Sequence, residues 1–522
     1  MAEPNPYTHI VEITRDRAAQ YPDDIAYWFE GRETSFRALD TRASQIANGL
    51  IELGVQPGER VAFLGKNMDL YYEILFGVVK ARGAMTGVNN RLAPPEIAYI
   101  VNDSKARVLF VTADFFDAVD AIRDECPELE TVIAIEGDHE GWPSYLDWRD
   151  DQSTDDPMLD NLANDDVIQL YTSGTTGFPK GVQLSSANYI AFMDQAFTLP
   201  WAKYEKTDRV MNAMPLFHVA GVNVGLLAAA QGALTVILRD VDPTLILRLV
   251  EEKKITHSFW VPAVILMLSQ QPNFREVDFS SLSHVSYGAS PIAEDLLKEA
   301  VEVMGCGFTQ LYGLTETIGG GTNLPNEAHD PSWGKLRSCG VPWPGALVRT
   351  VDGEGHPTAP GEVGEIVIKA PFVMKGYWNR PEATEEAVRD GWFHTGDAGY
   401  FDEEGFLYIH DRVKDMIVSG GENVYPAEVE NAIFSHPDVA DVAVIGIPSE
   451  RWGEEVKAFV VKKPGTDPAP EDIIAFSRER IAAYKAPKSV DFIDELPRNP
   501  SGKILRKDLR EPYWKDVERR VG

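Results

Sequence analysis

Thr172-Ser173-Gly174-Thr175-Thr176-Gly177-Phe178-Pro179-Lys180-Gly181 is a run of small, hydroxyl-bearing and glycine residues that closes with a lysine. Glycines let backbone N–H groups approach an anion closely, hydroxyls add donors, and the lysine adds a full positive charge. The run follows the apolar segment 167–171, which predicts a buried strand. Glycine-rich turns at strand ends are where α/β proteins hold phosphate groups. This stretch therefore predicts an α/β fold with a polyphosphate-binding loop.

The loop is not of the Walker A type. Pro179 stands where that pattern requires its second glycine, and Gly181 follows the lysine. Residues 182–184 look extended, so no helix is expected directly after Lys180. A plain surface turn is the alternative, because serine, threonine and glycine are common in turns. The position directly after a buried strand favours anion binding.

Further motifs follow along the chain in a fixed order: Tyr312-Gly313-Leu314-Thr315-Glu316, Thr395-Gly396-Asp397, Asp411-Arg412-Val413-Lys414-Asp415 and Pro500-Ser501-Gly502-Lys503. Together with the loop they resemble the adenylate-forming superfamily, which includes acyl-CoA synthetases, luciferases and the adenylation domains of peptide synthetases. Within it the chain is most similar to bacterial fatty-acid–CoA ligases. The resemblance spans residues 22 to 509, nearly the whole sequence.

The alternation of apolar strands and periodic helices predicts parallel sheets covered by helices. We expect an α/β body of parallel and mixed sheets over 1–411, with a β-rich subdomain at about 340–409, where glycines and short strands accumulate. A small, mobile α+β domain is expected over 412–522. Lys414 is the predicted hinge by resemblance, and an ordinary exposed connector is the alternative.

Several elements are predicted individually. Helices are expected at 36–53 with Gly54 as C-cap, at 70–79, at 426–434 and at 472–482. Strands are expected at 61–64, 108–111, 364–368, 442–447 and 456–461.

Bulk properties restrict the class of protein. A net charge of −32 over 522 residues argues against nucleic acid as a partner, because its phosphates would be repelled. The three cysteines, far apart, suggest a reducing compartment, and no secretory leader or membrane-spanning run is expected. We expect a cytoplasmic protein with at most weak peripheral contact with a membrane. A homodimer is left open.

The resemblance implies transfer of AMP from ATP to a carboxylate, with Mg²⁺ as cofactor. It assigns ATP or AMP binding to Thr172, Ser173, Gly174, Thr175, Thr176, Lys180, Gly288, Ala289, Tyr312, Gly313, Thr315, Asp397, Arg412 and Lys503. Lys503, Glu316, Thr315 and Lys180 are the implied catalytic residues. Glu316 is the implied Mg²⁺ ligand, with the hydroxyl of Thr172 as a weaker candidate. On its own, Lys503 would be a solvated surface charge.

The implied second half-reaction is attack of the CoA thiolate on the acyl-adenylate. Gly420 and Gly421 would let the pantetheine arm pass close to backbone, and Trp452 would flank it. Ordinary packing between the domains is an equally good interpretation of Trp452.

The acyl pocket is expected around Phe217, His218, Gly221, Val261, Gly319 and Gly320. His218 is expected as a gate or wall rather than a base, because a carboxylate needs no deprotonation at neutral pH. The glycine run 319–321 is expected to remove side-chain volume from the pocket wall, so that a long or bulky apolar tail could pass. The preferred substrate is therefore a medium- to long-chain fatty acid, with an aryl or steroid-side-chain acid second.

Two other functions stay open at this point. The acyl group could pass to a carrier-protein thiol or, as in luciferases, to oxygen. A nucleotide-binding scaffold without catalysis is the third, and the presence of Lys180, Glu316 and Lys503 argues against it.

Overall fold

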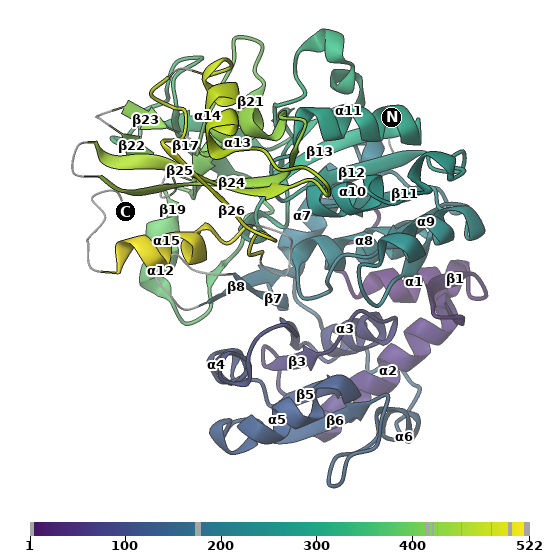
Figure 1. Ribbon diagram of the computed structural model, residues 1–522. Coiled ribbons are helices and arrows are strands. Elements are labelled where there is room, and N and C mark those ends of the chain that lie inside the picture. The colour runs from purple at the N-terminus through teal and green to yellow at the C-terminus, as the bar shows by residue number, and fades with distance from the viewer. Residues whose placement is uncertain are drawn as a thin grey trace.

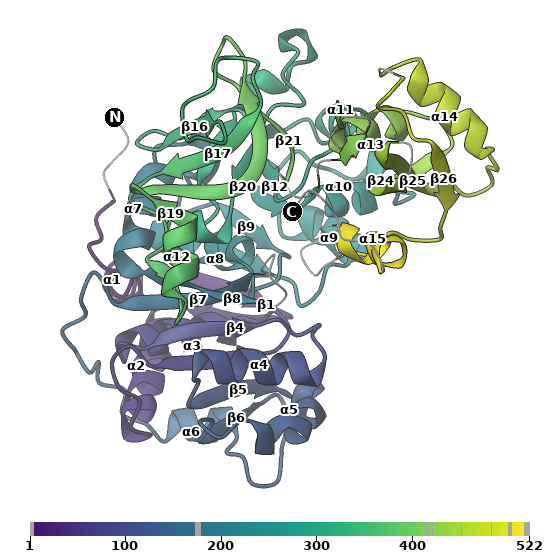
Figure 2. The same ribbon diagram turned by 90° about the vertical axis from the view of Figure 1, so that its left-hand side faces the viewer.

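The structure is a computed structural model, and two views of it are given in Figures 1 and 2. It describes residues 5–172, 179–412, 415, 417–419, 422–424, 426–449, 452–481, 483–498 and 504–515, without the side chains of 410–412, 418, 422, 423 and 453.

One sheet of the N-terminal body has seven strands in the described part of the chain, in the order β18-β8-β7-β4-β3-β5-β6. Its strands are β3 (Arg60–Leu64), β4 (Ala84–Val88), β5 (Val108–Thr112), β6 (Thr131–Ile135), β7 (Asp166–Thr172), β8 (Lys180–Ser185) and β18 (Gly376–Tyr377). Strands β3 to β7 pair in parallel, whereas β8 and β18 are antiparallel. The parallel part is buried on both faces, as its continuous apolar runs predict.

The other sheet of the body has nine strands among the described residues, in the order β15-β14-β13-β12-β11-β9-β10-β1-β2. They are β1 (Ile25–Phe29), β2 (Arg32–Ser35), β9 (Arg209–Asn212), β10 (Leu234–Ile237), β11 (His257–Trp260), β12 (His284–Gly288), β13 (Gly307–Gly313), β14 (Gly321–Leu324) and β15 (Val341–Pro342). Strand β12 pairs in parallel with both β11 and β13, whereas β13 pairs in antiparallel with β14 on its other side.

Helices connect and cover these strands (Figure 1). They are α1 (Glu12–Gln20), α2 (Phe36–Glu52), α3 (Leu70–Lys80), α4 (Pro94–Ser104), α5 (Phe116–Ile122), α6 (Tyr145–Asp150), α7 (Ser186–Ala196), α8 (Val219–Gln231), α9 (Pro243–Glu252), α10 (Pro262–Ser269) and α11 (Glu294–Met304). The core joins both sheets through α3 and α8. Tyr72 of α3 stacks on Tyr27 of β1 with ring centroids 4.6 Å apart, and its hydroxyl donates to the carbonyl of Gly221 in α8.

The green segment of Figure 1 forms the β-rich subdomain, which has its own sheet. Its elements are β16 (Leu347–Val351), β17 (Gly364–Lys369), α12 (Pro381–Ala387), β19 (Val388–Arg389), β20 (Trp392–Phe401) and β21 (Leu407–Arg412). Strand β18 leaves this subdomain and adds to the seven-stranded sheet beside β8. The subdomain is therefore attached to the body at the position of the predicted anion loop.

The yellow-green C-terminal unit projects from one side of the body in Figure 2. It consists of β22 (Ile417–Ser419), β23 (Glu422–Val424), α13 (Pro426–Phe434), β24 (Val439–Ser449), β25 (Gly453–Lys462), α14 (Pro470–Arg478), β26 (Ser489–Phe492) and α15 (Arg506–Trp514). Its sheet has a separate apolar core that includes Val429, Val444 and Val456. A unit with its own core is expected to move as a body.

The predicted fold class is confirmed: a mixed α/β N-terminal domain with several sheets is followed by a small C-terminal domain. Local signals set element ends well where caps are clear. The Ser35 hydroxyl accepts from the N–H of Ala38 at the start of α2, and Gly54 has a φ of +81° directly after its end. The helix predicted at 472–482 was too long, because α14 ends at Arg478. Among the described residues, no helix has the length and apolarity to cross a bilayer.

Candidate functional site

A cleft of about 2010 Å³ lies where the N-terminal body, the β-rich subdomain and the C-terminal domain meet. It brings together residues that are far apart in the sequence. The sequence-predicted residues along its walls are Thr172, Lys180, His218, Val261, Ala289, Tyr312, Gly313, Thr315, Glu316 and Asp397. From the C-terminal domain, α13 contributes Ala427, Glu428 and Asn431.

The anion loop connects two antiparallel strands rather than a strand and a helix. Thr172 at the end of β7 is paired with Lys180 at the start of β8, so the ends of the loop are adjacent. The predicted residues Ser173, Gly174, Thr175 and Thr176 lie outside the described residues. The Lys180 ammonium is 4.9 Å from the ring centroid of Tyr377, within the range of a cation–π contact. This contact holds the lysine on the cleft side of the hairpin.

Glu316 is held by the β-rich subdomain. It lies in a single turn after β13, is only 7% exposed, and accepts a hydrogen bond of 2.8 Å from the Tyr377 hydroxyl at its Oε1. Its main-chain carbonyl accepts from the N–H of Met374. Tyr377 therefore touches both Lys180 and Glu316. The sequence analysis missed Tyr377, because only the pairing of β18 with β8 brings it there.

Tyr312 and Asp397 form a second fixed pair in the cleft. The Tyr312 hydroxyl donates to Asp397 Oδ2 at 2.9 Å, and the Asp397 N–H donates to the Thr395 hydroxyl at 3.0 Å. Burial, with the negative charge of Asp397 as a second cause, raises the pKa of Tyr312 well above its usual value. Asp397 is paired across the sheet with Arg412, whose side chain lies outside the description. The result is a carboxylate with a fixed orientation.

The backbone is tightly packed where β12 and β13 end. A Cβ on Gly288 would collide with the carbonyl of Leu311, and one on Gly313 would collide with the carbonyl of Gly319. Ala289 follows with a φ of +69°. Glycine is thus required at two of these positions for strand backbones to approach each other. Gly288 itself does not line the cleft, whereas Ala289 does.

A smaller apolar cavity of about 90 Å³ adjoins the cleft. The two share lining residues at the ends of α8, β12 and β13: Val219, Ala220, Ala289, Leu311 and Gly313. Of the predicted acyl-pocket residues, Gly319 lines this cavity, and His218 and Val261 line the cleft. Phe217, Gly221 and Gly320 line neither.

The glycine run 319–321 serves close packing. A Cβ on Gly320 would lie 2.9 Å from the Phe372 ring and 3.2 Å from the Trp343 ring. A Cβ on Gly321 would lie 2.7 Å from the carbonyl of Tyr312. The space that a side chain would take at Gly320 and Gly321 is thus filled by neighbours. The expectation that this run opens a wide passage has no support at these two positions.

His218 precedes α8 and lies against Phe217, with ring centroids 4.7 Å apart. Burial lowers its pKa to about 4, so the imidazole is neutral at pH 7. Its Nε2 is buried and has no hydrogen-bond partner among the described residues. A neutral ring of this kind is suited to forming a wall.

The remaining predicted residues divide into two groups. Lys414, Gly420, Gly421 and Lys503 lie outside the described residues. Trp452 is described and 39% exposed, and it lines neither the cleft nor the inner cavity.

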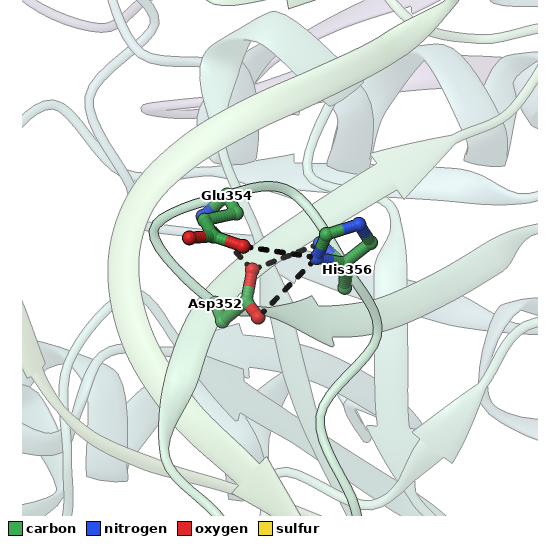
Figure 3. Close-up of side chains that lie close together, drawn as sticks. All are labelled: Asp352, Glu354 and His356. Atoms are coloured by element: carbon green, nitrogen blue, oxygen red, sulfur yellow. Dashed lines mark hydrogen bonds and ion pairs between the residues drawn. The ribbon is translucent and has the colours of Figure 1, made fainter.

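An exposed group of Asp352, Glu354 and His356 follows β16 (Figure 3). The Asp352 carboxylate accepts from the N–H groups of Glu354 and His356, both at 2.9 Å. These bonds within one turn account for the grouping, so it is a feature of the turn.

Comparison with known proteins agrees with this architecture. Residues 14–378 match the model of the AMP-binding enzyme family, and 428–503 match the AMP-binding enzyme C-terminal domain. The chain is 41% identical to a fatty acid–[acyl-carrier-protein] ligase, ScoC, of Streptomyces coeruleorubidus over 98% of both chains. It is 40% identical to a feruloyl-CoA synthase of an Amycolatopsis species over 95% of this chain and 97% of that protein. The solved anthranilate CoA ligase AuaEII, in complex with anthranoyl-AMP, superposes with a TM-score of 0.91 at 29% identity, covering 98% of both chains.

The chain therefore belongs to the AMP-binding enzyme family and is an adenylate-forming enzyme of the AMP-forming acid–thiol ligase class.

Proposed function

We propose that this protein is an ATP-dependent acyl-CoA ligase: it joins a carboxylic acid to AMP with release of pyrophosphate, and then transfers the acyl group to the CoA thiol. One observation carries this proposal. Lys180, the Tyr377–Glu316 pair and the Tyr312–Asp397 pair meet in a single cleft, and an apolar cavity opens beside them. Polar groups for a nucleotide and an apolar chamber for an acyl tail are thus adjacent.

In the first half-reaction, negative charge develops around the α-phosphate, and positive groups must offset it. Lys180 is suited to this because its ammonium faces the cleft beside Tyr377. We assign Thr315 to the α-phosphate and Lys503 to the α-phosphate and the attacking carboxylate. The loop residues Thr172, Ser173, Gly174, Thr175 and Thr176 are assigned to the β- and γ-phosphates.

The nucleoside is assigned to the second pair. A carboxylate held in one orientation accepts hydrogen bonds from two ribose hydroxyls well, and Asp397 is such a carboxylate. We assign Arg412 to the same hydroxyls. The adenine is assigned to the space beside Tyr312, Gly313, Gly288 and Ala289.

The donor set of the cleft suits Mg²⁺. Glu316 supplies a carboxylate and Thr172 a hydroxyl, both on the cleft wall, and Mg²⁺ prefers a few such oxygens with phosphates and water completing its shell. When bound, the ion would offset phosphate charge. The Tyr377 hydroxyl fixes the Glu316 side chain for this role.

The second half-reaction requires a change of catalytic groups. We propose that the C-terminal domain, 412–522, rotates about Lys414 against the body, 1–411. Rotation would withdraw Lys503 and bring Gly420 and Gly421 to the cleft for the pantetheine arm. Trp452, exposed on the C-terminal domain, remains assigned to flank that arm.

The candidate substrates are fatty, aryl and steroid-side-chain acids, and the relatives include enzymes named for the first two. A medium- to long-chain fatty acid is the substrate favoured by the sequence. Transfer to a carrier-protein thiol is the second candidate function, favoured by the 41% identity to a fatty acid–[acyl-carrier-protein] ligase.

The test is AMP release from ATP with Mg²⁺ over a panel of fatty, aryl and steroid-side-chain acids, with and without CoA. Release that needs both an acid and CoA supports the proposal. Pyrophosphate exchange with an acid but no turnover with CoA would move the assignment to a carrier protein. Gly421→Leu should spare pyrophosphate exchange and slow thioester formation, and equal loss of both would contradict the assignment of Gly421.

A further inference from the structure

The inner cavity is long and narrow. It meets the cleft at Val219, the first residue of α8, and Leu227 lines it eight residues further along the same helix. At 1.5 Å per residue, this part of the wall is about 12 Å long. A volume of about 90 Å³ along that length leaves little width.

The strands on the opposite wall show which end of the cavity is closed. Val261, directly after β11, lines the cleft, whereas His257, the first residue of β11, lines the cavity. Four residues of a strand span about 13 Å. His284 is paired with His257 at the start of β12 and lines the cavity as well. The cavity thus leads away from the cleft, and Leu227, His257 and His284 lie at its far end.

This far end is held in place from behind. Tyr204 also lines the cavity, and its ring packs against the His257 ring with centroids 5.0 Å apart. The Tyr204 N–H donates to the side-chain oxygen of Gln231 at 3.0 Å, and Gln231 Nε2 donates to the carbonyl of Leu227 at 3.2 Å. Gln231 therefore fastens the loop of Tyr204 to the last turns of α8. We call Tyr204, Leu227 and His257 the cavity floor.

The side wall at Trp343 is closed as well. Trp343 is 1% exposed, and the rings of Phe192, Trp201 and Phe372 have centroids 5.5, 5.6 and 5.9 Å from its own. Close-packed interiors have few voids into which such rings could move. The cavity is therefore unable to widen on this side for a broad group.

The size and polarity of the cavity restrict the group that enters it. A cavity of about 150 Å³ holds one benzene ring, whereas a water-sized group takes up about 30 Å³. The volume of about 90 Å³ is too small for a ring and corresponds to about three groups of the size of a methylene. Among the described residues, its lining includes no carboxylate, lysine or arginine that would pair with a charged tail. The end of an unbranched alkyl chain suits such a space.

We infer that the acid is an unbranched fatty acid of about four to eight carbons, and that the cavity floor sets its maximum length. The carboxylate and the first carbons would lie in the cleft and at its junction with the cavity, beside Val219 and Ala289. The last carbons would fill the cavity. An extended chain gains about 1.2 Å per bond, so the length of about 12 Å does not accommodate a palmitoyl tail. This inference rests on the proposed function and narrows the fatty acid to the short end of its series.

The test measures AMP release by the full-length enzyme with ATP, Mg²⁺ and CoA. The acids are the saturated even-numbered series from butyrate to palmitate, with cinnamate as the aryl acid. The kcat/KM should be highest between butyrate and octanoate. It should be lower by about tenfold or more for dodecanoate, palmitate and cinnamate.

Variants at two neighbouring leucines of α8 connect the limit to the floor. Leu227→Ala should move the best substrate to an acid about two to four carbons longer, because the shortened side chain leaves a cavity. Leu227→Phe should move it toward butyrate. Leu226→Ala is the matched control, because Leu226 is equally buried but lines neither the cavity nor the cleft. A fold defect would lower the rates with all acids and leave their order unchanged.

The outcomes separate the inference from the proposed function. If dodecanoate, palmitate or cinnamate is the best substrate of the parent enzyme, the chain-length inference is wrong and the ligase assignment stands. AMP release with none of these acids, under conditions where ATP binds, would overturn both. An unchanged order of acids in Leu227→Ala and Leu227→Phe, or the same shift in Leu226→Ala, would overturn the assignment of the cavity floor.

Discussion

The cleft and the inner cavity lie side by side, but their walls differ in charge. In the cleft, the Tyr312 hydroxyl is bonded to Asp397 and the Tyr377 hydroxyl to Glu316. The cavity is lined instead by aromatic and aliphatic side chains such as Phe192, Trp343 and Leu227, and its lining among the described residues includes no carboxylate, lysine or arginine.

The difference follows from what each region binds in our proposal. The nucleotide is the same in every turnover, so the cleft gains from side chains fixed in advance. The acyl part of the acid is apolar in our proposal, and a wall without charged side chains suits it.

The largest effect is expected on adenylation in the cleft, from the loss of the Lys503 side chain. Lys503→Ala should lower acid-dependent pyrophosphate exchange by about a hundredfold to a thousandfold, because a positive group at the α-phosphate is lost. ATP binding, measured by calorimetry, should persist, and the preference among acids should not change. Lys507→Ala, an exposed lysine of α15, is the control. Pyrophosphate exchange at the parent rate in Lys503→Ala would contradict the assignment of Lys503 to the α-phosphate.

The second largest effect is expected from adding a side chain behind the cavity wall, where Gly320 packs against Phe372 and Trp343. In Gly320→Ala the new methyl group would lie 2.9 Å from the Phe372 ring and 3.2 Å from that of Trp343. The free energy of unfolding should fall by about 1 to 3 kcal/mol, the usual cost of an added methylene in a packed core. Gly353→Ala is the control, since nothing lies within 4 Å of its Cβ position. The free energy of unfolding of both variants is measured by denaturant titration. Equal values would show that the Phe372 and Trp343 rings can shift to make room for the methyl group.

Acidification should destabilise the cavity side. Burial lowers the pKa of His284 to about 4, against about 6.5 in the unfolded chain. Between pH 6.5 and 4 the unfolded state therefore binds a proton that the folded state does not. The free energy of unfolding falls as the pH falls, by at most about 1.4 kcal/mol per unit for this group.

His284→Asn should flatten that dependence, measured by denaturant titration at pH 7.5, 6.0 and 5.0. His356→Asn, in the exposed turn of Figure 3, is the matched control. An unchanged slope in His284→Asn would show that other groups cause the acid sensitivity.

The smallest effect is expected from undoing one fixed pair of the cleft. Tyr312→Phe removes the hydrogen bond to Asp397 and should cost about 1 kcal/mol, seen as a KM for ATP raised about fivefold. The order of preference among the fatty, aryl and steroid-side-chain acids should remain as in the parent, because Tyr312 does not line the inner cavity. A changed preference among acids with an unchanged KM for ATP would contradict the assignment of Tyr312 to the nucleotide.

The sequence by itself determined the class of fold and the order of its parts. Continuous apolar runs at 61–64 and 108–111 specify strands buried on both faces, and caps at Ser35 and Gly54 set the ends of α2. These signals are local, since each depends on residues a few positions apart. The motif around Thr172 and Lys180 predicted an extended β8 correctly for the same reason.

Only the tertiary structure decided which side chains meet. Tyr377 reaches Lys180 and Glu316 because β18 joins β8 across nearly 200 residues of chain, and no local pattern specifies that pairing. The run 319–321 illustrates the converse: glycine suggested open space, but Phe372 and Trp343 fill the position beside Gly320. Local propensity fixes the path of the backbone, whereas the volume and polarity of a site arise from side chains that packing brings together.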